Sequence, residues 1–168
     1  YSKKYLVQGI EYFSFLRPLY ELQIAKLFSR YPKYFGAFLS CNEANKTASG
    51  SRKPTGKWCG KCSKCLFVFA CLYPFAQEKQ LIKIFKENLL RDKSLIPVQE
   101  QLTGKKGFKP FECVGTIKES IAAFTMCSQK LQGKPVVHPR ILSTWDKQNF
   151  LPKPLDTALR NAMLKSGE

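Results

Sequence analysis

The chain has 168 residues, of which 44% are hydrophobic and 13% aromatic, a composition that excludes a disordered protein and suffices for one buried core. Its formal net charge of +16 favours polyanionic partners such as nucleic acid, acidic membrane or a phosphorylated ligand. No apolar run approaches the roughly 20 residues that a spanning helix needs, so we expect no membrane span. Seven cysteines, four of them at metal spacing and at least one unpaired, favour a reducing cytoplasm over a secreted disulfide scaffold. Because the sequence begins at Tyr1 rather than Met, we interpret it as the C-terminal part of a longer protein.

The first half of the chain carries two helix signals separated by a polar loop. Pro18 and the apolar spacing after it predict a helix over 18–30, which Pro32 ends. Turn-forming residues predict a loop over 40–58. The apolar run that follows the cysteine cluster predicts a buried helix that ends at Pro74.

The second half is also predicted to be helical. Apolar spacing predicts helices over 77–90 and 94–104, and a glycine-rich basic loop follows over 104–115. Thr116 and Glu119 form the pattern of a capping box, which opens a further helix that Gly133 ends. The large apolar residues of that helix are expected on its core side: Ile117, Ile121, Phe124 and Leu131.

The last part of the chain differs in composition. Residues 134–154 contain four prolines and indicate an extended segment, and a short helix is expected over 156–165. His138, the one histidine, is expected to have no chemical role. The predicted fold is therefore mostly α, with a helical region over 1–133 and a Pro-rich extension of the same domain over 134–168.

Four of the seven cysteines show the spacing of a metal site. Cys41, Cys59, Cys62 and Cys65 follow the pattern C-x17-C-x2-C-x2-C, within the region 36–70. Two residues between cysteines allow a tight turn to direct both sulfurs at one ion, and Gly60 supplies the backbone freedom for it. Four thiolates leave no open coordination position, so we predict a structural zinc site.

Other interpretations of the cysteines remain open. A Cys-x-x-Cys redox pair is disfavoured because no strand precedes it and a third cysteine repeats the spacing. An iron–sulfur cluster is the main rival of zinc. Cys71 and Cys127 lie within apolar helices and are expected to be core residues.

Several stretches together resemble a known enzyme family. The zinc motif alone is similar to that of the PP-loop deazaguanine nitrile synthases. Residues 40–42, 57–69 and 108–115 (FKPFECVG), in this order, and the stretch 19–34 look like the UDP-N-acetyl-muramoyl-L-alanyl-L-glutamate epimerase family. The resemblance covers about residues 15–130, and the FKPFECVG stretch is its most specific part.

Membership of this family implies an ATP- and magnesium-dependent enzyme of peptidoglycan synthesis. It would convert the terminal L-glutamate of the UDP-linked muramoyl dipeptide into D-glutamate. The implied parent fold is an α/β PP-loop ATP pyrophosphatase, of which this chain would be the zinc-bearing C-terminal portion. The superfamily's nucleotide loop, Ser-Gly-Gly-x-Asp-Ser, does not occur in this sequence, so the nucleotide site is expected in an N-terminal half and the fragment alone is expected to be inactive.

The basic loop over 104–115 is the candidate substrate site. Glu112 and Cys113 are the candidates for acid–base catalysis, with magnesium ligation an alternative for Glu112. We expect both to line a pocket with the start of the following helix, well apart from the zinc. Four further residues are expected to bind the anionic substrate: Lys105, Lys106, Lys109 and Gly115. A solvated basic turn with a packed cysteine is the alternative.

Two other functions fit parts of the sequence. A different PP-loop enzyme that modifies a nucleobase or tRNA would explain the positive charge equally well. A non-enzymatic zinc module that binds nucleic acid would need aromatic and basic residues interleaved on an exposed face, whereas most aromatics here fall at core spacing. The charge predicts only weak, non-specific nucleic-acid binding that fades at physiological salt.

Overall fold

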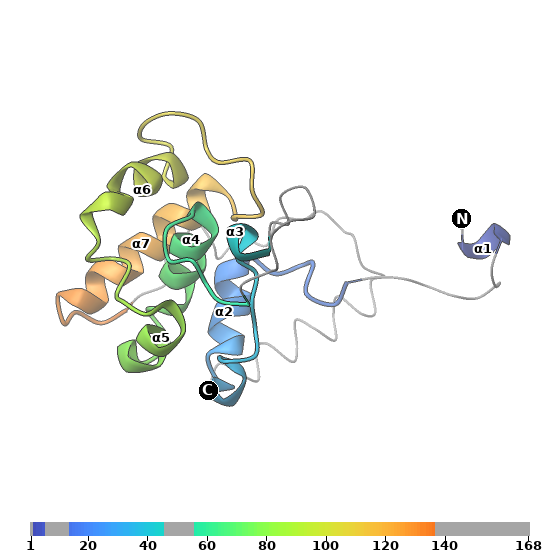
Figure 1. Cartoon of the computed structure of the whole chain (residues 1–168), viewed down its shortest axis with the longest axis horizontal. Helices are drawn as coiled ribbons and strands as arrows, with labels where there is room; N and C mark the ends of the chain where they lie inside the picture. The colour runs from blue at the N-terminus through green and yellow to red at the C-terminus, as the bar shows by residue number, and fades with distance from the viewer. Residues whose placement is uncertain (1, 6–13, 46–55, 137–168) are drawn as a thin grey trace. The chain divides into compact units, whose positions relative to one another are not determined.

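A computed structural model describes residues 2–5, 14–45 and 56–136 (Figure 1). The chain divides into two units, and the larger one comprises residues 20–144. The short helix α1 (Ser2–Tyr5) and residues 14–19 belong to the other unit. The described residues contain helices and turns but no strand, as the mostly α prediction requires. His138 and the predicted helix over 156–165 lie outside the described residues.

Helix α4 is the central element of the larger unit. It contacts helices on several sides: α2, α5, α6 and α7 (Figure 1). The elements of this unit are α2 (Glu21–Phe28), η1 (Pro32–Tyr34), α3 (Asn42–Asn45), α4 (Ser63–Leu72), α5 (Glu78–Phe85), η2 (Lys93–Leu95), α6 (Ile96–Leu102) and α7 (Ile117–Leu131). None of the helices in the described ranges is long and apolar enough to cross a membrane.

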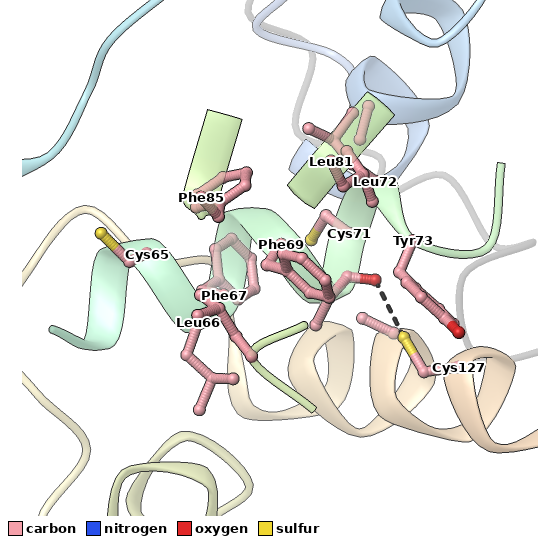
Figure 2. Close-up of a cluster of buried hydrophobic side chains, with 14 of the residues drawn as sticks. Cys65, Leu66, Phe67, Phe69, Cys71, Leu72, Tyr73, Leu81, Phe85 and Cys127 are labelled. Atoms are coloured by element: carbon pink, nitrogen blue, oxygen red, sulfur yellow. Dashed lines mark hydrogen bonds between the residues drawn. The ribbon is translucent and has the colours of Figure 1, made fainter. Parts of the chain in front are cut away.

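The sequence of α4 explains its central position. Nine of its ten residues are buried, and Phe67 and Phe69 are fully enclosed (Figure 2). A helix that is apolar on every side must be covered on every side, and each fully buried phenylalanine contributes about 1.5–3 kcal/mol. The helix ends one residue before Tyr73, where Lys130 of α7 donates hydrogen bonds to the carbonyls of Tyr73 and Ala76, both at 2.7 Å.

Two helices are shorter than the periodicity predicts. Helix α2 begins at Glu21 rather than near Pro18, and Gln23 Oε1 accepts a hydrogen bond from the Tyr20 amide at 2.9 Å. Helix α5 ends at Phe85, where Lys86 takes a left-handed conformation with φ 73°. Leu89, which the predicted helix over 77–90 would include, lies beyond the observed helix but is still buried.

Helix α7 confirms its predicted start and contradicts its predicted core face. Glu119 N donates to Thr116 Oγ1 at 3.1 Å, and Thr116 N donates to Glu119 Oε2 at 3.2 Å, which completes the capping box. Phe124 is half-buried and packs against the core, but three of the four expected core residues are exposed by 40–48%: Ile117, Ile121 and Leu131. The buried face consists of Glu119, Ser120, Ala122, Ala123, Met126 and Cys127.

The difference between the predicted and the observed core face of α7 has a physical reason. Helices α4 and α7 contact each other, and the residues of α7 that are buried include Ala122 and Ala123, which allow two backbones to approach closely. Both cysteines that were predicted as core residues are buried there. Cys127 Sγ donates to the Ala70 carbonyl at 3.2 Å, and Cys71 lies on α4 (Figure 2).

Candidate metal centre and the adjoining basic loop

The sulfurs of Cys41, Cys59, Cys62 and Cys65 converge, and all lie within 4.8 Å of one another. The Cys41–Cys62 separation is 3.9 Å, and Cys65 Sγ lies 3.5 Å from Cys62, 3.6 Å from Cys59 and 3.6 Å from Cys41. A tetrahedral ion with bonds of about 2.3 Å to sulfur sets its ligands about 3.8 Å apart. The four cysteines therefore fit one zinc ion in both number and spacing.

The turn before α4 positions three of these sulfurs. Cys62 is the N-cap of α4, and its sulfur accepts a hydrogen bond from the Cys65 amide at 3.4 Å. Gly60 has φ 73°, the left-handed conformation that the sequence predicted for the tight turn. The Lys61 amide donates to Cys59 Sγ at 3.4 Å. Two backbone N–H groups, those of Lys61 and Cys65, therefore point at cysteine sulfurs, an arrangement that suits thiolates.

Cys41 reaches the centre from the other side of the long loop. Its sulfur accepts a hydrogen bond from Ala44 N at 3.4 Å, at the short helix α3. Trp58, next to Cys59, closes the loop, because its indole N–H donates to the Phe38 carbonyl at 3.2 Å. Its ring also contacts those of Phe38 and Phe85, at centroid distances of 5.2 and 4.8 Å. Aromatic packing therefore brings the distant cysteine to the other three.

The sulfurs influence one another's protonation. The hydrogen bond between Cys62 and Cys65 lowers the pKa of Cys62 to about 5, and the same contact raises the pKa of Cys65. The lowered pKa favours the thiolate form of Cys62. A cation is the natural counterpart of such a set, since thiolates are the form that binds zinc.

The end of the basic loop is attached to the first turn of α4. Ser63 Oγ donates to Glu112 Oε2 at 2.6 Å, and Lys64 Nζ donates to the Cys113 carbonyl. Ser63 directly follows Cys62, one of the four candidate metal ligands. The expectation that Glu112 and Cys113 lie well apart from the zinc is therefore wrong, because the loop is attached to residues of the metal knuckle itself.

Lys64 connects the loop to α2 as well. It is buried, with its ammonium 3.7 Å from Glu21 Oε2 at the start of α2. Glu21 and Lys64 also line a cavity of about 410 Å³ whose other walls come mainly from apolar side chains of α2 and α4. Neither Glu112 nor Cys113 lines this cavity, so it is not the pocket that the sequence predicted for them.

The start of α7 holds a carboxylate of its own. Glu119 is buried and accepts hydrogen bonds from Thr116 N and, across the fold, from Leu22 N at 2.8 Å. Burial raises the pKa of this carboxyl. The Thr116 amide at this helix start is therefore already paired with an internal carboxyl group, and the predicted substrate pocket at this place stays a prediction.

Gly115 packs between buried side chains. A Cβ atom there would lie 2.4 Å from Glu119 Oε2 and 2.5 Å from Phe67 Cζ. This close approach explains the glycine without a ligand. Its predicted role in substrate binding stays a prediction.

The middle of the loop is open to solvent. Lys105 and Lys106 are exposed, Lys109 is half-buried, and Cys113 is exposed. Phe108 and Phe111, which flank Lys109, are exposed by 95% and 107%. The loop's lysines, Glu112 and Cys113 therefore lie on one largely exposed segment, and the described residues do not enclose them in a pocket.

Sequence reasoning missed three features of this region. Lys64 lies between two candidate zinc ligands and was interpreted as a surface charge. Glu119 was assigned only to its local capping box. Phe108 and Phe111 were used as family markers, although two aromatics beside lysines in a turn-rich segment are themselves a signal of exposure.

The fold and the centre define a helical domain with four converging cysteines that could hold one metal ion, and comparison with known proteins identifies its family. A sequence profile of the MurL C-terminal domain matches residues 37–149, which include all four cysteines and the basic loop. The chain belongs to this family, as the resemblance in the sequence predicted.

Three curated relatives carry the name UDP-N-acetyl-alpha-D-muramoyl-L-alanyl-L-glutamate epimerase. The chain is 41% identical to the one from Micromonospora over 128 residues, 75% of the chain. It is 40% identical over 119 residues, 71% of the chain, to that of Salinispora tropica and 38% identical over 134 residues, 80% of the chain, to that of Xanthomonas oryzae. The matches span only 28%, 25% and 29% of the relatives' own lengths. No solved structure matches the chain.

Proposed function

We propose that this chain is the C-terminal part of an enzyme that epimerises the terminal L-glutamate of UDP-N-acetyl-muramoyl-L-alanyl-L-glutamate to D-glutamate, for peptidoglycan synthesis. The observation that carries the proposal is the 38–41% identity to relatives named for this activity, over 71–80% of the chain. The matched region includes the cysteine centre and the loop of Glu112 and Cys113.

The chemistry of the substrate gives a reason for ATP. The α-proton of glutamate is very weakly acidic when its carboxylate is ionised, because the carbanion would form beside a negative charge. An acyl-adenylate lacks that charge, and its carbonyl can accept the electron pair. We infer that the α-carboxylate attacks the α-phosphorus of ATP, which forms the acyl-adenylate and releases pyrophosphate, and that magnesium would neutralise the phosphate charges.

Proton transfer and hydrolysis then complete the reaction. A base removes the α-proton from one face, and a proton returns to the carbon from the opposite face. Water then attacks the acyl carbon, which releases AMP and restores the carboxylate. The nucleotide-binding loop of the PP-loop superfamily is not in this sequence, so in this proposal ATP binds to another part of the enzyme.

Glu112 and Cys113 are our candidates for the two proton carriers. The hydrogen bond from Ser63 orients the Glu112 carboxylate, and the Cys113 backbone is held by Lys64 while its thiol is open to solvent. A carboxylate and a thiol on consecutive residues can serve as two different groups, as inversion at carbon requires. The exposed Lys105 and Lys106, together with Lys109, would attract the anionic substrate.

We assign the metal a structural role. Zinc, held by Cys41, Cys59, Cys62 and Cys65, would cross-link the cysteine-bearing loop to α4. Four thiolate ligands would leave no open coordination position for a substrate. Ser63 and Lys64, which anchor the catalytic candidates, belong to the turn that the metal would fix. Loss of the metal should therefore disorder the anchor of the loop.

The test is an assay of the full-length protein with ATP, magnesium and the UDP-linked L-Ala-L-Glu substrate, followed by acid hydrolysis and chiral chromatography of the glutamate. We expect D-glutamate, with AMP and pyrophosphate as the nucleotide products. An analogue with a methylene bridge between the α- and β-phosphates should not support turnover, whereas a β,γ-methylene analogue should. Glutamate that stays entirely in the L form with ATP present would contradict the proposal.

A further inference from the structure

Two phenylalanines in the basic loop stand out because they are almost fully exposed. Phe108 and Phe111 are exposed by 95% and 107%, more than any other large hydrophobic residue of the described ranges. A phenylalanine that stays in water forgoes the favourable transfer that drives folding. Two of them three residues apart therefore call for an explanation other than packing within this domain.

Hydrogen bonds hold the loop at both ends, and this backbone arrangement keeps Phe108 and Phe111 exposed. At its start, Lys105 N and Lys106 N donate to the Glu100 carbonyl at 2.9 and 3.4 Å, and Gly104 has a left-handed conformation with φ 70°. At its end, Glu112 is bonded to Ser63, as described above. Figure 1 shows the segment arching between α6 and α7. The anchored ends hold the two rings away from the core.

Basic residues alternate with these rings. The segment reads Lys105-Lys106-Gly107-Phe108-Lys109-Pro110-Phe111, with both rings, Lys105 and Lys106 exposed and Lys109 half-buried. This is the exposed interleaving of cations and aromatic faces that nucleotides bind to, since bases stack on rings while ammonium groups neutralise phosphates. Pro110 restricts the backbone between the rings.

We propose that Lys105, Lys106, Phe108, Lys109 and Phe111 bind the nucleoside diphosphate end of the substrate. The base stacks on Phe108 or Phe111, and the lysines contact the diphosphate. The inference rests on the proposed function, because the relatives are named for a uridine diphosphate-linked substrate. It adds that the aromatic side chains, and not only the charges, select the nucleotide.

A docking surface for another protein fits the same segment less well. The centres of protein–protein interfaces are depleted in charged residues and in lysine particularly, whereas three lysines lie within five residues here. Stacking on an exposed ring needs no apolar surroundings, because every base offers a flat face. The charge pattern therefore favours a small anionic ligand with a base.

Isothermal titration of the full-length protein with UDP and with inorganic pyrophosphate separates the two contributions. Pyrophosphate carries the charges without the base. We expect Phe108→Ala or Phe111→Ala to weaken UDP binding about five- to a hundredfold, the scale of one lost stacking contact, and to leave pyrophosphate binding unchanged. Lys105→Ala combined with Lys106→Ala should weaken both ligands, and Phe→Tyr at the affected position should restore UDP binding.

Tyr34→Ala provides the matched control. Tyr34 is an exposed aromatic, with Lys33 Nζ 4.9 Å from its ring centroid, but it belongs to η1 rather than to the loop. This variant should bind UDP as the wild type does. Because all three aromatic side chains are exposed, we expect unchanged thermal stability and zinc content in every variant.

Two results would overturn the inference: unchanged UDP affinity in both Phe variants, or an equal loss of UDP and pyrophosphate affinity in those variants. The epimerisation assay distinguishes failure of the loop assignment from failure of the proposed function. Epimerisation by the wild type with unaltered UDP affinity in both Phe variants would refute only the loop assignment. UDP binding that depends on a ring, without epimerisation, would instead refute the function and keep the nucleotide site.

Discussion

The carboxylate of Glu119 accepts a hydrogen bond from the backbone N–H of Leu22 at 2.8 Å, although the two residues are 97 positions apart. Its other oxygen accepts the amide of Thr116 at 3.2 Å. One buried side chain thus caps the first turns of α2 and α7 and joins the two helices to each other. Each cap contributes about 1 kcal/mol.

Protonation of Glu119 should make stability depend on pH. Burial, and next the charge of Glu21, raise its folded-state pKa above 4.5, and the buried Cys71 thiol lies near it. For an acid with a raised pKa, the folded state favours the protonated form, so stability is lost as pH rises through the folded pKa. We therefore expect Glu119→Gln to become more stable relative to the wild type as pH rises from the ordinary carboxyl range toward neutral.

Urea unfolding of both proteins across this range measures the difference. Because the zinc site and all other groups are common to the two, their pH dependence cancels. Glu119→Gln replaces one acceptor oxygen by a donor, so it should be less stable by about 1–3 kcal/mol near pH 5. A difference that does not change with pH would show that Glu119 keeps an ordinary pKa.

Gly115 should tolerate no side chain. A Cβ atom would approach both Glu119 Oε2 and Phe67 Cζ within 2.5 Å, so Gly115→Ala must displace a buried carboxylate or a core ring. We expect a loss of about 1–3 kcal/mol in thermal or urea unfolding. Gly36→Ala is the control, because nothing lies within 4 Å of its Cβ position. Equal stability of the two variants would contradict the packing described here.

Zinc should be lost with any one of its ligands. Cys62→Ala removes a sulfur and also the N-cap of α4, so we expect the zinc content by elemental analysis to fall from about one per chain toward zero. The region around residues 40–65 should unfold with it. Cys113→Ser alters an exposed thiol outside the centre and should keep its zinc. Iron in the purified protein in place of zinc would refute the assignment.

The sequence predicted the local features of this domain well. The buried helix after the cysteine cluster, observed as Ser63–Leu72, and the capping box of Thr116 depend on short spacings, and both were confirmed. The sulfurs of the four predicted cysteines also converge, whereas their binding of zinc stays a prediction. Such patterns are visible because the interacting groups are neighbours along the chain. Gly60 was predictable for the same reason.

Features that depend on distant partners could not be predicted in this way. The core face of α7 was assigned to its largest apolar residues, but contact with α4 selected the small side chains around Ala122 and Ala123 instead. The attachment of Glu112 to Ser63 joins residues 49 positions apart, and that of Glu119 to Leu22 joins residues 97 apart. No local pattern reports such pairs.

Glu112 and Cys113 should matter for turnover more than for folding. Glu112→Gln keeps an oxygen that can accept the Ser63 hydrogen bond but loses the basic carboxylate, and Cys113→Ala removes an exposed thiol. In the full-length enzyme we expect each to lower kcat about a hundredfold or more, with zinc content and melting temperature retained. Wild-type kcat in both variants would leave this loop only a packing and binding role.

The most direct test of the account is proton NMR of the substrate in D₂O with the full-length enzyme and ATP. The α-proton of the terminal glutamate should disappear as the residue inverts, because the returned proton comes from solvent on the opposite face. The α-proton of the neighbouring L-alanine, which is not activated, should remain and serves as the internal control. Inverted, deuterated D-glutamate beside unexchanged alanine is the predicted result. A glutamate that keeps both its α-proton and its L configuration in the presence of ATP would contradict the account.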